Sequence, residues 1–348
     1  MAPKNQSPAE YAGVSAGWVG AFYSFDAKAI TILDDGYALD SIYFVSMLAH
    51  EYQHAIQDAR YGISATYDAH GTTLDSARAI SAVIEGEASV VGDRTLIHLF
   101  GDSPGDVPWS RVFQKWQARE RVGALLSTDP VTLAYSSFSY AFGTPYLHQA
   151  IAAGGWPGVD AVFGAPPSGV REVIAGFQAA APENGVWAEE LGDDAVPVLD
   201  NRFAFQRAER MGAWIVGLLI GRAVNFEDDP TLQVTGDELS FFRDQDTGTV
   251  VAVWRIRFST ANVAQSVRSA IERTMAGGVT PWGSVRLQLL GDRDMVLIGA
   301  ADASIPGAIP WDLTFRSAPP AASQGLDDGA GDGRRSEIRC PRPASLSF

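Results

Sequence analysis

The chain has 348 residues, of which 46% are hydrophobic and 10% aromatic, and its formal charge at pH 7 is −15. This length and apolar content exclude a disordered chain and predict one large core or two. The negative charge repels phosphate backbones and anionic lipid headgroups, so we expect no nucleic-acid partner. The single cysteine, Cys340, excludes an internal disulfide and a zinc site built from several thiolates.

The N-terminal part of the chain predicts a β-hairpin followed by a helix. Residues 20–25 and 29–33 are rich in aromatic and β-branched side chains and flank a turn. Asp40 or Ser41 can cap a helix that runs to about Arg60, and Gly62 can end it. A hairpin therefore precedes the first long helix.

A second long helix follows a loop. The loop contains Gly62, Tyr67, Asp68, His70 and Gly71, and Thr72–Asp75 opens a helix that runs to about Leu99. Proline and glycine residues then divide residues 108–169 into shorter, mainly helical pieces. The first unit is therefore mostly α after its hairpin.

An acidic, glycine-containing stretch between Pro182 and Pro197 marks the predicted domain boundary. Beyond it we expect helices over 203–224 and 262–275 and strands over 238–242, 250–258, 285–290 and 294–299. The expected fold class is α+β: a mainly helical domain with an N-terminal hairpin over 1–190, a smaller α+β domain over 191–316 and a disordered tail over 317–348.

No segment predicts a membrane span. The apolar run from Met211 to Ile220 has about half the length that a bilayer requires, and residues 1–11 lack the apolar core of an export signal.

The first long helix contains the pattern His50-Glu51-Tyr52-Gln53-His54. Residues four apart lie on one helix face, so both histidines can direct a nitrogen at one zinc ion, while Glu51 lies about 100° round and can reach a water molecule there. Zinc acidifies water and polarises carbonyl groups, and the glutamate accepts the proton. The pattern favours metal-assisted hydrolysis; the alternative is an ordinary pair of partly buried helix histidines.

A catalytic zinc site needs a third protein ligand. The metzincin motif would place a histidine at position 60, where this chain has Arg60, so that class is excluded. His70, Glu85 and Glu87 remain, and the two glutamates lie about 200° apart on a helix, so they cannot both face the metal. Glu87 suits an ion pair with Arg94. The face of Glu85 is favoured because it carries small side chains that allow close helix packing: Ser81, Ala82, Ala88, Ser89 and Gly92.

HEYQH followed by EGEA resembles the gluzincins, zinc peptidases with two histidines on one helix and a glutamate on the next. In their aminopeptidase branch the third ligand likewise begins a Glu-Gly-x-Ala string, which also selects Glu85. The interval between His54 and Glu85 is longer here than in the thermolysin pattern.

A longer series of segments is similar to a poorly characterised family of bacterial and archaeal predicted metallopeptidases, often secreted or lipid-anchored. The resemblance implies a secreted or periplasmic protein, and an edge strand, here Ala29 to Leu33, that pairs with an extended substrate backbone. The chain departs from the family at Ser139-Tyr140, where the pattern has Pro-Tyr, but keeps Gly143. The segments are GAFYSFDAKAITIL, LAHEYQHAIQD, AVIEGEA, FSYAFGTPYLHQAIAAGGWPGVDAVFGAPPSG and TVVAVWRIRFST.

Gluzincins also supply a tyrosine or histidine that stabilises the oxyanion beside zinc. The candidates here are Tyr140, Tyr146 and His148, and each could equally be a packed aromatic or a surface histidine. The second nitrogen of a ligand histidine needs an acceptor, for which Ser89, Asp58 and Asp93 are candidates.

Together these features predict a zinc-dependent peptidase that acts on a peptide or protein substrate. His50, His54 and Glu85 would bind Zn²⁺, and Glu51 would act first as base and then as acid. One alternative is a metal-dependent hydrolase with a non-peptide substrate, because such a site polarises any carbonyl. The other is a non-catalytic binding or scaffold protein in which the helix pair is purely structural.

Overall fold

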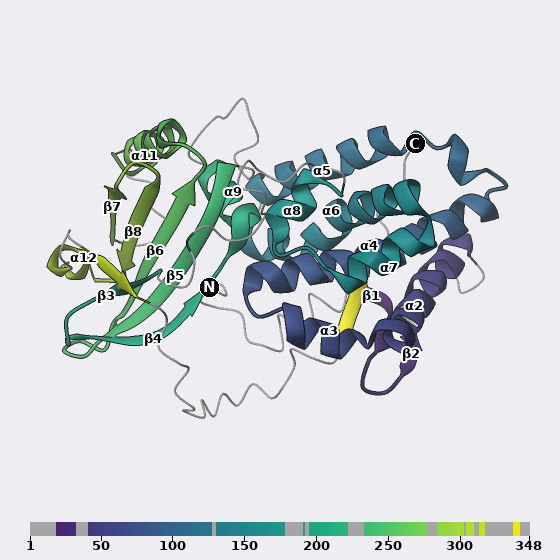
Figure 1. Cartoon of the computed structure of the whole chain (residues 1–348), viewed down its shortest axis with the longest axis horizontal. Coiled ribbons are helices and arrows are strands. Elements are labelled where there is room, and N and C mark those ends of the chain that lie inside the picture. The colour runs from purple at the N-terminus through teal and green to yellow at the C-terminus, as the bar shows by residue number, and fades with distance from the viewer. Residues whose placement is uncertain are drawn as a thin grey trace.

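A computed structural model describes the larger part of the chain: residues 19–32, 41–126, 130–177, 191, 195–221, 233–276, 284–302, 304–309, 313–316 and 337–341. A group of helices lies at one end of the molecule and an antiparallel sheet at the other (Figure 1). This arrangement confirms the predicted α+β fold.

The predicted hairpin and first helix are present. Strands β1 (Val19–Ser24) and β2 (Ala29–Ile32) pair antiparallel, and helix α2 (Ile42–Tyr61) follows. The Ser41 side chain accepts a backbone N–H of the first turn of α2, and Gly62, at φ 62°, ends the helix in the left-handed conformation that glycine adopts without steric cost. Both ends lie where the sequence predicts them.

The predicted loop after Gly62 is instead a helix, α3 (Ile63–His70). Gly62 and Gly71, which suggested a loop, stand at its two ends. The helix is anchored at Ile63, whose side chain is only 2% exposed. Ile63, the first residue of α3, is therefore part of the core. The positions of the glycines do not predict this burial.

The second long helix, α4 (Leu74–Leu99), begins at the cap that the sequence predicts. Thr73 forms a capping box with Ser76, in which each side chain accepts a backbone N–H from the other residue. The helical part is completed by five elements: η1 (Pro104–Asp106), α5 (Trp109–Leu126), α6 (Pro130–Gly154), α7 (Trp156–Gly164) and α8 (Val170–Ala175). None of the helices described combines the length and apolar character needed to cross a bilayer.

The C-terminal part is built on a five-stranded antiparallel sheet with the order β4-β5-β6-β8-β7. A short pair, β3 with β9, lies in a separate two-stranded sheet. The elements are β3 (Val196–Val198), β4 (Phe203–Glu209), α9 (Gly212–Gly221), β5 (Val234–Asp244), β6 (Val250–Phe258), α11 (Ala261–Ala276), β7 (Ser284–Leu290), β8 (Asp294–Ala300), α12 (Ile305–Ala308) and β9 (Thr314–Arg316).

The prediction of a continuous helix over 203–224 is wrong in its first half, which forms β4. Phe203 and Phe205 lie two residues apart and so share one face of the strand, where both pack against the same hydrophobic cluster. Residues 212–221 are helical, as expected, in α9. Residues 222–224 lie outside the described residues.

A third strand joins the N-terminal hairpin from the far end of the chain. β10 (Glu337–Pro341) pairs antiparallel with β1, which gives the order β10-β1-β2. The expectation of a disordered tail over 317–348 is therefore wrong for these five residues. The rest of that tail lies outside the described residues.

One hydrophobic core joins the two predicted domains. Its buried members include Tyr23 of the hairpin, Ile84 of α4, Phe142 of α6, Trp214 of α9 and Met295 of β8. A smaller cluster covers the other face of the sheet. The predicted boundary between 1–190 and 191–316 is therefore no break in the packing of the described residues.

The C-terminal part also holds the start of α4. The backbone N–H of Leu74 donates to Glu209 Oε1 at 2.8 Å, and that of Asp75 donates to the carbonyl of Arg210 at 3.0 Å. N–H groups in the first turn of a helix have no partner within it. The end of β4 supplies these partners and so fixes where α4 begins.

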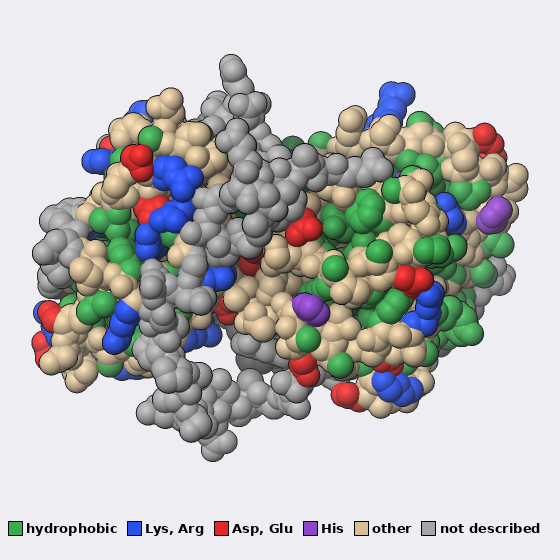
Figure 2. Space-filling view, viewed as in Figure 1, with side chains coloured by type: hydrophobic (Ala, Val, Ile, Leu, Met, Phe, Trp, Pro, Cys, Tyr) green, Lys and Arg blue, Asp and Glu red, His purple; other side chains and the backbone are tan. Residues whose placement is uncertain are grey.

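Charged side chains are distributed unevenly on the face shown in Figure 2, where Lys and Arg gather over the sheet and hydrophobic side chains are frequent over the helices. Arg255 and Arg257 of β6 both pair with Asp294. Part of the positive charge of the sheet is therefore neutralised within the protein.

Helices α4 and α6 cross at a point where a glycine of each helix contacts the backbone of the other. A Cβ on Gly143 would lie 2.0 Å from the carbonyl oxygen of Ala82, and one on Gly86 would lie 2.5 Å from the carbonyl carbon of Gly143. Both distances are far inside van der Waals contact, so a side chain at either position would force the helices apart. Gly86 lies between Glu85 and Glu87, which makes the crossing part of the framework of these glutamates.

Gly143→Ala is expected to lower the free energy of unfolding by about 3 kcal/mol, because the added methyl group collides with backbone atoms. Urea denaturation followed by circular dichroism measures this change. Gly123→Ala in α5 is the matched control, since its Cβ would lie 3.8 Å from Leu133 Cδ2, an ordinary contact. The control should stabilise the protein by up to about 1 kcal/mol; equal effects of the two substitutions would contradict the close crossing.

Candidate metal centre

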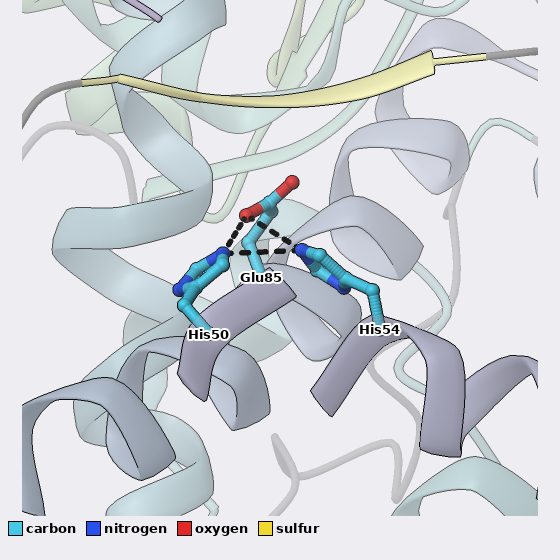
Figure 3. A group of neighbouring side chains, drawn as sticks. All are labelled: His50, His54 and Glu85. Atoms are coloured by element: carbon cyan, nitrogen blue, oxygen red, sulfur yellow. Dashed lines mark hydrogen bonds and ion pairs between the residues drawn. The ribbon is translucent and has the colours of Figure 1, made fainter. Parts of the chain in front are cut away.

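His50 and His54 of α2 and Glu85 of α4 converge on one point (Figure 3). His50 Nε2 lies 3.1 Å from His54 Nε2 and 3.2 Å from Glu85 Oε2, and His54 Nε2 lies 3.7 Å from the same oxygen. A tetrahedral zinc ion about 2.0–2.1 Å from its ligands would separate them by about 3.3 Å. The spacing of the three donor atoms therefore fits a metal ion of this size.

Small residues bring α4 close to α2 at this point, as the pattern on the Glu85 face predicts. A Cβ on Gly92 would lie 3.2 Å from the carbonyl oxygen of Ser46 and 3.5 Å from His50 Cβ. The Ser46 hydroxyl donates to the carbonyl of Gly92 at 2.9 Å, which ties the two helices together. The two histidines thus face Glu85 across a tight helix contact.

Burial and mutual charge determine the protonation of the three side chains, which are at most 5% exposed. Burial lowers the pKa of His50. Burial also opposes charge on His54, but the Glu85 carboxylate outweighs it and raises the pKa of His54 to about 9. Burial favours the neutral form of Glu85, yet the two imidazoles lower its pKa to about 2. Without a metal, the site therefore holds an imidazolium beside a carboxylate, and a metal ion would displace that proton.

Glu51 is fully buried next to this trio. One of its oxygens, Oε2, accepts the backbone N–H of Tyr23 in β1 at 2.8 Å. The other, Oε1, has no hydrogen-bond partner among the described residues. Burial raises the pKa of Glu51 to about 8, with opposing contributions from His54 and Glu85. A buried carboxyl oxygen is costly to leave unpaired, so Oε1 is placed to form a hydrogen bond with a bound molecule.

A second layer of hydrogen bonds orients His54. Gln57 Nε2 donates to the carbonyl of Ile84 at 2.9 Å and to Glu87 Oε2 at 2.8 Å. The oxygen of the Gln57 amide lies 2.8 Å from His54 Nδ1 and can only accept, so Nδ1 carries a proton, and the proton that a metal ion would displace is the one on Nε2. Gln53 Nε2 donates to the other oxygen of Glu87 at 2.9 Å.

This layer differs from the sequence-based expectation. Gln57 was missed as the partner of a ligand histidine, and the proposed acceptors Ser89, Asp58 and Asp93 do not fill that place. Asp58 instead accepts from the Tyr23 hydroxyl at 2.9 Å and so holds the hairpin on α2. The spacing of His54 and Gln57, three residues apart on one helix face, is the signal that could have found the contact.

The structure separates the candidates for the third ligand. Glu85 lies with the two histidines. Glu87 is 1% exposed and accepts from two glutamine amides, so it is an anchor of the second layer and not a solvated partner of Arg94. His70 is exposed at the end of α3.

The three oxyanion candidates of α6 lie in different surroundings. The ring of Tyr140 stacks near that of His50, with 6.3 Å between centroids and 29° between planes. Tyr146 is buried in the core against Phe177. His148 packs against two aromatic rings, those of Trp109 at 5.0 Å and Phe113 at 5.4 Å. The structure thus brings only Tyr140 of these three beside a ligand histidine.

The strand that the sequence predicts to pair with substrate, Ala29 to Leu33, contains β2, which lies at an edge of the sheet in the order β10-β1-β2. The strand that contacts Glu51 is its neighbour, β1. Tyr23 of β1 touches Glu51 directly, whereas β2 (Ala29–Ile32) pairs with the opposite edge of β1 from β10. Leu33 lies outside the described residues.

Comparisons of the chain with models of known protein families, with curated proteins and with solved structures give no match. The resemblance to the gluzincins therefore stays a prediction from motifs, and the metal centre is supported by its geometry.

Gln57→Ala is expected to weaken zinc binding about 10- to 100-fold, because His54 loses the acceptor that fixes its orientation. Competition with a chromophoric chelator measures the affinity. Gln53→Ala is the matched control: it removes an amide from the same helix and the same Glu87 carboxylate but leaves His54 untouched. An equal loss in both variants would assign the effect to the Glu87 network as a whole.

Proposed function

We propose that the protein is a zinc-dependent peptidase in which His50, His54 and Glu85 hold the metal. The observation that supports this most directly is the position of Glu51, a buried carboxylate with one unpaired oxygen, beside three donor atoms spaced for one ion. Two imidazoles and one carboxylate are a ligand set of catalytic zinc sites, which keep one position open.

A zinc ion bound there would polarise a substrate carbonyl and make a water molecule more acidic. Glu51 Oε1 accepts the proton of the attacking water, because Oε2 is held by the Tyr23 N–H. Glu51 then passes this proton to the leaving amine, and a pKa near neutrality suits a group that must both accept and donate. Tyr140, beside His50, is the candidate donor to the oxyanion.

A peptide substrate is favoured by the contact between Glu51 and a β-strand. An extended polypeptide can add to a strand through backbone hydrogen bonds, and β1 contacts the proposed base through its own backbone. The second candidate, hydrolysis of a non-peptide carbonyl compound, uses the same residues without the strand. A purely structural helix pair is disfavoured, because the buried charge of Glu85 and the unpaired Glu51 oxygen would lower stability and would serve no function.

Glu51→Gln should retain zinc but lose hydrolysis of fluorescein-labelled casein by a factor of about 100 or more, since the amide cannot accept the proton. Glu85→Ala should lose zinc. Metal per chain is measured by mass spectrometry, and Glu272→Gln, an exposed carboxylate on α11, serves as the control.

Two outcomes would contradict the proposal. Absence of bound zinc in the parent at neutral pH would remove both enzymatic candidates. Zinc binding with hydrolysis of small esters but no cleavage of casein would replace the peptidase by the second candidate.

A further inference from the structure

Strand β1 has a neighbour on each edge. On one edge it pairs with β2, and on the other it pairs with β10 through Phe22↔Arg339, Tyr23↔Ile338 and Ser24↔Glu337. The hairpin partner is adjacent in the chain, whereas β10 comes from the opposite end. Within the described residues, β1 therefore offers no open edge to another strand.

β10 lies over the metal centre. Tyr23, whose N–H is 2.8 Å from Glu51 Oε2, is the residue of β1 that pairs with Ile338. Neighbouring strands lie about 4.8 Å apart, so the backbone at Ile338 is one strand spacing from the residue that binds the proposed base. Figure 3 shows β10, in yellow, passing above His50, His54 and Glu85.

We propose that β10 occupies the position in which an extended polypeptide substrate pairs with β1, so that the chain covers its own metal centre. This inference rests on the proposed function and adds the binding mode and its regulation. Backbone pairing is indifferent to side chains, so a segment of this chain and an extended substrate compete for the same edge. Substrate must displace β10 before it reaches Glu51.

The displacement leaves the rest of the site in place. The β1–β2 ladder runs from Ala21↔Ile32 to Ser24↔Ala29 and does not involve β10. The Tyr23 hydroxyl and Lys28 both bind Asp58, at 2.9 and 2.5 Å, which holds the hairpin on α2. The hairpin thus keeps contacts of its own when β10 leaves.

The rival arrangement keeps β10 as a permanent third strand, with substrate on the outer edge of β10 or of β2. Each of these edges is one strand spacing, about 4.8 Å, farther from β1 and therefore from its contact with Glu51. The position of β10 is the nearer one. In the rival arrangement, loss of β10 would lower the activity or leave it unchanged, and would not raise it.

The test breaks the β10 pairing in the full, zinc-loaded chain. Successive N–H groups of a strand point to opposite edges, so Ile338→Pro combined with Arg339→Pro removes the one that faces β1. Casein hydrolysis should rise about threefold or more, because a tethered competitor acts at an effective concentration of about a millimolar. Ser345→Pro with Leu346→Pro, beyond the end of β10, is the matched control and should leave the rate unchanged.

Binding is measured separately from cleavage. A fluorescein-labelled peptide with the sequence of residues 335–342 is added to the Glu51→Gln protein with and without the β10 substitutions. Its fluorescence anisotropy should show at least about threefold tighter binding when β10 is broken. A lower or unchanged rate together with unchanged peptide affinity would overturn the inference. Tighter peptide binding without any casein cleavage would overturn the peptidase and leave the inference standing.

A further measurement needs no change in β10, in case the proline variant does not fold. Hydrogen exchange is followed in zinc-loaded Glu51→Gln with and without saturating casein. Amides of residues 337–340 should exchange faster when casein is present, whereas those of β2 should not. Unchanged protection of β10 in the complex would overturn the displacement.

Discussion

The candidate metal centre depends on one packing constraint, which is that α4 lies in close contact with helices on two sides. Towards α2, Gly92 lets the backbone of α4 approach Ser46 and His50. Towards α6, Gly86 and Gly143 meet without side chains. This double contact buries a stretch of α4 that carries two carboxylates, Glu85 and Glu87, and so determines that both must find partners inside the protein.

The two carboxylates are satisfied in different ways. Glu85 faces two imidazoles and is held charged by them, whereas Glu87 accepts hydrogen bonds from two uncharged amides. The amide of Gln57 connects the two arrangements, since it binds Glu87 on one side and His54 on the other. A substitution at Glu87 is therefore expected to change the orientation of His54 through Gln57, although no atom of Glu87 belongs to the group of three donor atoms.

Features that depend on neighbours along the chain could be predicted from the sequence. The ends of α2 follow from Ser41 and Gly62, and the choice of Glu85 follows from helix periodicity and the small residues on its face. The start of α4 at Thr73 is likewise a local signal.

Features that depend on distant partners could not be predicted. β4 has an alternating pattern too short to distinguish from a helix until its partner β5 is known. The spacing of Gln57 from His54 is a local signal, but the direction in which its amide points rests on contacts with Ile84 and Glu87 of another helix. β10 lies in a segment rich in glycine and charge, and only its pairing with β1 makes it a strand.

The pairing of β10 with β1 also has a consequence for the order of events during synthesis. Phe22 and Arg339 are neighbours in space but lie almost a full chain length apart in sequence. Contacts of such long range close the largest loop and form late in folding. Every residue of the metal centre leaves the ribosome long before Arg339 does. The residues of the candidate metal centre can therefore come together while β1 still has an open edge, and β10 can pair with β1 only after Arg339 has been synthesised.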